Sequence, residues 1–158
     1  MRFLLLQEGN KSNVLLSENA VELLDIKKRH IVKITANEKY IITKCGSVKW
    51  LCKEINSSYG KYNRGGILES NFFYKFIKYC YQNSIKKAVI EPLYSSGNGY
   101  NVLKTELEYL TEHFGNSSCL NTNNIPYIPK TIHAKRGSNW LTQNEYLNFM
   151  KLLKKYDY

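Results

Sequence analysis

The sequence has few acidic residues, few prolines and no long apolar run. In 158 residues, 13 Asp and Glu stand against 23 Lys and Arg, for a formal net charge of +10 with neutral histidines. Such a surplus creates a strong positive field, so the expected partner is a polyanion: nucleic acid first, an acidic protein second. No apolar run approaches the roughly 18 residues of a transmembrane helix. The run after Met1 ends at Gln7, too early for a signal peptide. We expect a cytoplasmic protein with no membrane partner.

Cysteine is also too scarce for a disulfide scaffold. Its four copies are scattered, with no CxxC pair, at Cys45, Cys52, Cys80 and Cys119. They are expected to be reduced thiols, and a zinc site is not favoured. The sequence has no phosphate-binding glycine loop, no HExxH and no GxSxG. These absences exclude several common enzyme classes at the level of motifs.

Aromatic residues are plentiful, and the chain length suits one folded domain spanning residues 1–158. Aromatics make up 13% of the chain, which argues against general disorder. Strand-like patterns cover residues 2–6, 13–16, 30–35, 39–44 and 85–93. Helices are expected to begin near Ser17, Ser47, Ser70, Asn101 and Thr142.

The expected helices carry apolar residues at helical spacing. These sets are Val48, Leu51, Cys52 and Ile55; Phe73, Phe76, Ile77 and Cys80; Leu103, Leu107, Leu110 and Phe114; and Tyr146, Phe149, Met150 and Leu153. Residues 59–66 are expected to form a polar loop and residues 116–140 an irregular segment. The order predicts an α+β fold. Its sheet should be small, mainly antiparallel and three-stranded, flanked by helices, with an extra N-terminal hairpin and a C-terminal helix over residues 141–158.

Three stretches between residues 30 and 121 suggest a family. They read HIVKITANEKYIITKCGSVKWLCKEI, FFYKFIKYCYQNSIKKAVIEPLY and ELEYLTEHFGNSSCLN. In order and pattern they resemble the GIY-YIG nuclease domain. The resemblance implies that Tyr40 positions or activates a water, and that Glu106 binds one Mg²⁺ or Mn²⁺ ion. Lys49 stands nearest to the family's arginine, and the pair Leu120-Asn121 fits the end of the last motif.

The signature of that family is incomplete in this chain. Ile42 replaces the glycine that closes the second motif, and His30-Ile31-Val32 lacks the tyrosine of the first. Lysine offers a phosphate only a point charge, whereas arginine offers a bidentate clamp. Glu106 has a separate positional argument, because it lies beside the apolar stripe of its helix. Its alternative interpretation is a solvated residue on the flank of that helix.

Basic clusters with interleaved tyrosines are the second functional signal. The residues expected to bind nucleic acid are Lys27, Lys28, Arg29, Lys61, Arg64, Lys130, Lys135 and Arg136. Tyrosines can stack on unpaired bases, and the basic segment over residues 122–140 could follow a phosphate backbone. Each cluster alone could equally be a solvated face, and the segment could be a linker that packs the last helix.

Four hypotheses follow for the function. The leading one is a small metal-dependent DNA endonuclease of GIY-YIG type. The second is an inactive regulator or inhibitor on the same scaffold that binds DNA or RNA. The third is a metal-free ribonuclease that uses lysine, tyrosine and one of His30, His113 or His133. The fourth is a protein that binds an acidic protein surface.

Overall fold

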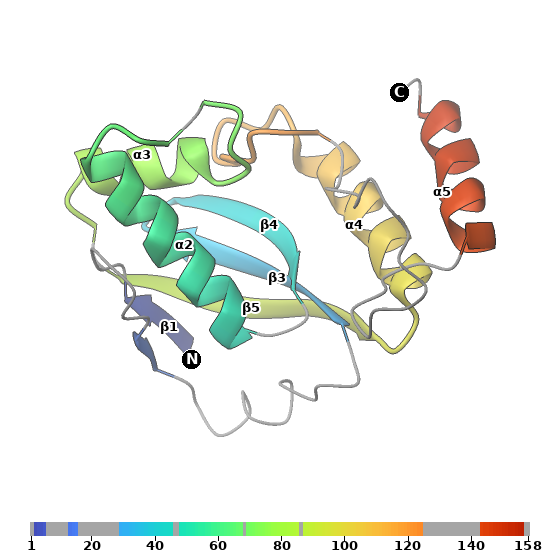
Figure 1. Ribbon diagram of the computed structural model, residues 1–158, viewed down its shortest axis with the longest axis horizontal. Coiled ribbons are helices and arrows are strands. Elements are labelled where there is room, and N and C mark those ends of the chain that lie inside the picture. The colour runs from blue at the N-terminus through green and yellow to red at the C-terminus, as the bar shows by residue number, and fades with distance from the viewer. Residues whose placement is uncertain are drawn as a thin grey trace.

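The computed structural model describes most of the chain. The described residues are 2–5, 13–15, 29–45, 48–67, 69–85, 87–124 and 143–156. This part of the chain forms five strands and four helices, whose arrangement is drawn in Figure 1. In chain order they are β1 (Arg2–Leu5), β2 (Asn13–Leu15), β3 (Arg29–Ala36), β4 (Lys39–Cys45), α2 (Val48–Asn63), α3 (Tyr74–Gln82), β5 (Lys87–Ser96), α4 (Gly99–His113) and α5 (Gln143–Lys155). The short helix expected after Ser17 lies outside the described residues.

The strands form one sheet in the order β2-β1-β5-β3-β4, and all four pairings are antiparallel. The α+β class is therefore confirmed. The predicted three-stranded unit, formed by β5, β3 and β4, is extended into a five-stranded sheet because β1 of the N-terminal hairpin pairs with β5. The β3–β4 hairpin turns at Asn37, whose φ of 55° is one that asparagine tolerates well.

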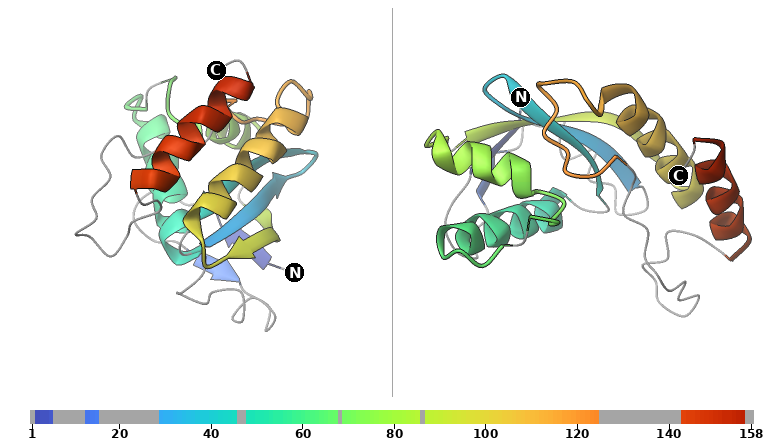
Figure 2. Two further views of the ribbon diagram at one scale, coloured as in Figure 1. Left: turned by 90° about the vertical axis from the view of Figure 1, so that its right-hand side faces the viewer. Right: turned by 90° about the horizontal axis from the view of Figure 1, so that it is seen from above.

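Helices cover both faces of this sheet. Because side chains alternate along a strand, Val32 and Ile34 of β3 face α2 and α3, whereas Ile31 faces α4. Figure 2 shows α2 and α3 on one side of the sheet, with α4 on the other and α5 beside α4. Phe149 and Leu153 of α5 are buried against α4. Met150, expected to point inward, is instead 36% exposed.

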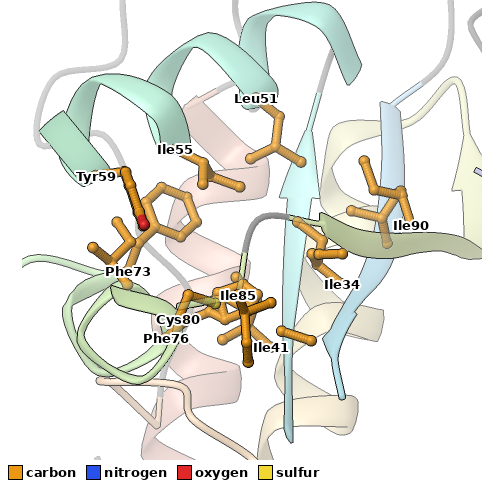
Figure 3. Packing of buried hydrophobic residues seen from close by; sticks show 14 of the residues in the cluster. Ile34, Ile41, Leu51, Ile55, Tyr59, Phe73, Phe76, Cys80, Ile85 and Ile90 are labelled. Carbon is orange, nitrogen blue, oxygen red and sulfur yellow. The ribbon is translucent and has the colours of Figure 1, made fainter. Parts of the chain in front are cut away.

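The largest core lies between α2, α3 and the sheet. Figure 3 shows its buried side chains, among them Ile34, Ile41, Leu51, Ile55, Tyr59, Phe76, Cys80 and Ile90. The prediction of a loop over residues 59–66 is wrong for its first part, because α2 continues to Asn63. Tyr59 lies four residues after Ile55 and is fully buried, so it extends the inward face by one more turn.

Two element ends also differ from the prediction. Helix α3 begins at Tyr74 rather than near Ser70, and the side chain of Asn71 accepts a hydrogen bond from the Phe73 amide at this turn. Strand β5, expected over residues 85–93, spans Lys87–Ser96 instead and so continues past Pro92. The pairing of β5 with β3 shifts register between Ile31 and Val32, and such an irregularity is where a strand accommodates proline.

The predicted boundaries of α4 need two corrections. It begins at Gly99, and the side chain of Asn98 caps it by accepting a hydrogen bond from the Asn101 amide. It ends at His113, because Phe114 turns to extended backbone. Phe114 was expected inside but is 41% exposed. Across the described ranges, no helix combines the length and the apolar character that crossing a membrane requires.

Candidate functional site

The outer edge of β4 carries the residues that the sequence singled out. This edge strand pairs with β3 on one side, so the backbone groups of Tyr40, Ile42 and Lys44 point to the other. The segment after α4 returns along this edge. The Tyr40 amide donates to the Ser118 carbonyl at 2.9 Å, and the Leu120 amide donates to the Tyr40 carbonyl at 2.7 Å. A short parallel bridge between Tyr40 and Cys119 results.

Asn121 continues the pairing with its side chain. Its Oδ1 accepts a hydrogen bond from the Ile42 amide at 2.9 Å, and its Nδ2 donates to the Ile42 carbonyl at 2.8 Å. The residue is only 1% exposed. An asparagine amide carries the same donor and acceptor pair as a peptide group, so Asn121 substitutes for a strand residue. The Leu120-Asn121 pair thus closes the sheet edge.

Glu106 completes the edge one step further along. Its Oε2 accepts from the Lys44 amide at 3.0 Å, and its Oε1 accepts from Lys44 Nζ at 3.2 Å. The glutamate is 0% exposed, at the centre of the inward face of α4. Burial raises the pKa of this carboxyl, and the neighbouring Lys44 opposes that rise. Glu106 is therefore neither a solvated flank residue nor a residue at an open margin.

This placement does not fit a metal ligand. A magnesium site usually keeps several waters around the ion and needs a carboxylate oxygen that faces them. Both oxygens of Glu106 instead accept hydrogen bonds from Lys44, one from its amide and one from its ammonium group. The ammonium group thus stands beside the carboxylate where a metal ion would have to bind. In the part of the chain that the structure describes, no three His, Cys, Asp or Glu side chains are grouped closely enough to hold a metal ion.

Tyr40 lies in a second group of polar side chains at the same edge. Its hydroxyl is 2.7 Å from Nδ1 of His113, the last residue of α4, and Lys33 Nζ lies 4.5 Å from the centre of its ring. The ring of Tyr109 is tilted against that of His113 at 6.4 Å. Burial chiefly raises the pKa of Tyr40, with smaller contributions from Cys119 and Glu112, so the phenol keeps its proton at neutral pH.

Cys119 borders this group but is not poised as a nucleophile. Its Sγ donates to Asn121 Oδ1 at 3.2 Å. Burial raises the pKa of the Cys119 thiol, and the thiol form is the less reactive one.

The three predicted catalytic residues do not converge. Glu106 contacts Lys44, which lies four residues from Tyr40 on β4, roughly 13 Å along the strand. Lys49 lies in the first turn of α2, which covers the opposite face of the sheet. The side chain of Lys49 lies outside the described residues.

Three of the residues expected to bind nucleic acid are described. Lys61 and Arg64 are exposed at the end of α2, and Arg29 is partly buried at the start of β3. Burial lowers the pKa of Arg29. The others, Lys27, Lys28, Lys130, Lys135 and Arg136, lie outside the described residues, as do His133 and residues 125–140 of the basic segment.

Sequence reasoning missed Lys33 and Lys44 as neighbours of the predicted residues. The pairing register of the β3–β4 hairpin could have identified Lys33. A two-residue turn at residues 37–38 sets Thr35 opposite Tyr40, so Lys33 is the diagonal neighbour of Tyr40 on the same face. No comparable signal pointed to Lys44, because its partner Glu106 lies on a distant helix.

Comparison with known proteins adds no assignment. No protein-family model, curated protein or solved structure matches this chain, and the resemblance to the GIY-YIG nuclease domain stays a prediction from the sequence.

Proposed function

We propose that the protein binds nucleic acid without using Glu106 as a metal ligand. The observation that carries this choice is the engagement of both Glu106 oxygens by Lys44. The missing first-motif tyrosine and the missing arginine support the same choice. The polyanion partner rests on the net charge of +10 and on exposed cations such as Lys61 and Arg64.

The magnesium-dependent endonuclease is the competing proposal. It requires Lys44 to release Glu106, so that a divalent ion and its waters reach the carboxylate. A cytoplasmic location also stays a proposal, supported by Cys80 and Cys119, whose thiols form no disulfide.

One assay separates binding from metal-dependent cleavage. The purified full chain is incubated with labelled DNA and RNA and with plasmid, in Mg²⁺, in Mn²⁺ or in EDTA. The proposal expects binding that weakens steeply with salt and no metal-dependent cleavage. Cleavage lost in EDTA and in Glu106→Gln would overturn it in favour of the endonuclease. Glu108→Gln is the matched control, because Glu108 is exposed on the same helix.

Failure to bind any nucleic acid at low salt would reject the proposal altogether. An acidic protein surface would then be the remaining explanation for the charge. Affinity that does not fall with salt would also contradict it, because phosphate contacts by lysine and arginine release counterions.

A second function is favoured by the Tyr40–His113 group. The sequence suggested lysine, tyrosine and histidine for a metal-free ribonuclease, and Lys33, Tyr40 and His113 lie together. When His113 Nδ1–H donates to the Tyr40 oxygen, Nε2 carries the lone pair of a general base. It would take the proton of a 2′-hydroxyl as that oxygen bonds to phosphorus. The 5′-oxygen then leaves and takes a proton from water, and Lys33 offsets the developing charge.

This second candidate has its own readout. Cleavage should persist in EDTA, should need the 2′-hydroxyl, and should fall by roughly a hundredfold or more in His113→Ala. Tyr109→Phe is the control, because it keeps the ring that packs on His113. Cleavage of DNA at the same rate, or unchanged cleavage by His113→Ala, would reject it.

A further inference from the structure

Four tyrosine rings form a continuous row where α2 and α3 meet. Tyr59 and Tyr81 have ring centres 5.6 Å apart, Tyr81 and Tyr62 are 5.2 Å apart, and Tyr62 and Tyr74 are 6.0 Å apart. The separations and tilts are those of favourable aromatic pairs. The row crosses from one helix to the other, so its geometry is set by the packing of α2 on α3.

The row is anchored at one end and open along the rest. Tyr59 is fully buried and belongs to the main core, which fixes the inner end. Tyr62, Tyr74 and Tyr81 are only partly buried, so each residue remains partly accessible to solvent. The turn after α2 consists of the exposed Gly65 and Gly66, and nothing lies within 4 Å of the position of a Gly65 Cβ. The amides of these glycines donate to the Tyr62 and Lys61 carbonyls, so the turn adds no side chain next to Tyr62.

Exposed cations lie on the same two helices as the row and directly after α2. Lys61, Arg64 and Lys78 are all exposed, and Lys78 Nζ lies 6.0 Å from the centre of the Tyr74 ring. Between residues 61 and 85 the sequence has one carboxylate, Glu69, against four lysines and arginines. The surface is therefore positive, and few acidic side chains are present to repel a phosphate backbone that approaches the tyrosines.

We propose that this surface, formed by Tyr62, Tyr74, Tyr81, Lys61, Arg64 and Lys78, binds single-stranded nucleic acid. Unpaired bases stack on the tyrosine rings, and the three cations contact the phosphates between them. A duplex hides its base faces within the helix, so this surface offers it only charge. The inference rests on the proposed nucleic-acid binding and adds the class of strand and the residues that hold it.

The first test concerns stacking. In fluorescence anisotropy with labelled single-stranded DNA and RNA, Tyr74→Ala should weaken binding at least about fivefold. Tyr74→Phe keeps the ring and should bind within about twofold of the wild type. An unlabelled duplex of equal length should compete more weakly than the single strand. Circular dichroism and thermal melting verify that each variant is folded.

The second test concerns charge and position. The triple variant Lys61→Gln, Arg64→Gln, Lys78→Gln should reduce the slope of log affinity against log salt by about 2, since each phosphate contact contributes about 0.7 in single strands. The matched control is Lys104→Gln, Lys151→Gln, Lys154→Gln, which removes three exposed lysines from α4 and α5. In the wild-type protein, photocrosslinks to a thiouridine-containing strand should map to Tyr62, Tyr74 or Tyr81.

The possible outcomes distinguish a failure of this surface from a failure of the proposed nucleic-acid binding. A wild-type protein that binds no nucleic acid overturns the proposed function and this surface together. Wild-type binding that Tyr74→Ala and the triple variant leave unchanged, or that favours the duplex, overturns this surface alone. When the variants do weaken binding, the affinities for the DNA strand and the RNA strand show which sugar the surface prefers.

Discussion

Glu106 and Asn121 were singled out as parts of a nuclease signature, yet both complete the backbone pairing of β4. Such residues are constrained because a buried amide or carbonyl without a partner is costly. Their chemical types suit both functions, since a carboxylate can accept from an amide as readily as it can bind an ion. Residue type and spacing alone could not distinguish the two. The contact with Lys44 favours the structural role, and it comes from tertiary structure.

The raised pKa of Glu106 predicts a pH dependence of stability. An acid whose folded pKa lies above its ordinary value of 4.5 contributes stability that is full below that value and is lost as pH rises through the folded pKa. The free energy of unfolding of the wild type, minus that of Glu106→Gln, should therefore fall as pH rises from 4.5. Urea denaturation at a series of pH values measures it. A difference that grows with pH would contradict the prediction.

Two of the described thiols, Cys80 and Cys119, pack near opposite faces of the sheet and should differ in reactivity. Cys80 is fully buried, and burial raises its pKa to about 12. Cys119 is partly exposed. Iodoacetamide at neutral pH should therefore modify Cys119 well before Cys80, as followed by peptide mass spectrometry. In denaturant both should react, and equal rates in the native protein would show that the packing around Cys80 opens readily.

Among the helices and strands, the sequence predicted most features that depend only on the local pattern of apolar residues. Strands β3 and β4 and the inward faces of α3 and α4 were predicted because apolar spacing reports burial directly. The end of α2 was missed because Tyr59 is amphipathic and its burial depends on α3. The course of β5 past Pro92 was missed because its register shift depends on β3. The edge pairing of β4 was missed because its partners lie 79 residues away.

Removal of the Asn121 side chain tests the edge of the sheet. Asn121→Ala leaves the Ile42 amide and carbonyl without their partners, so the free energy of unfolding should fall by about 2–4 kcal/mol. The Ile42 amide should also exchange faster with solvent. Urea denaturation and amide exchange measured by NMR provide the two readouts. Asn123→Ala, at an exposed position two residues on, should change neither, and a similar loss there would contradict the assignment.

The buried apolar clusters of the whole molecule differ in size on the two sides of the sheet. One large cluster joins α2 and α3 to the sheet, whereas α4 and α5 share a separate smaller cluster of Leu103, Leu107, Phe149 and Leu153. Stability is therefore expected to be divided between the two sides.

Phe149→Ala should reveal that division. It removes the largest buried side chain of α5, so the amides of α5 should exchange rapidly while those of Ile34 and Ile77 stay protected. Native-state hydrogen exchange gives the measurement. Met150→Ala, at the next and partly exposed position, is the control. Equal loss of protection across all elements would show instead that the molecule unfolds as one unit.

The closure of β4 by Asn121 also has a consequence for the order of events during synthesis. A hairpin such as β3–β4 forms within microseconds once both strands are available. Its outer edge then waits for a residue 79 positions later, which is roughly 4–16 seconds of translation. Throughout that interval the nascent chain presents an open strand edge to its surroundings. The ribosome-bound chain is thus most prone to mispairing before Asn121 emerges, and a factor that shields strand edges would have its largest effect then.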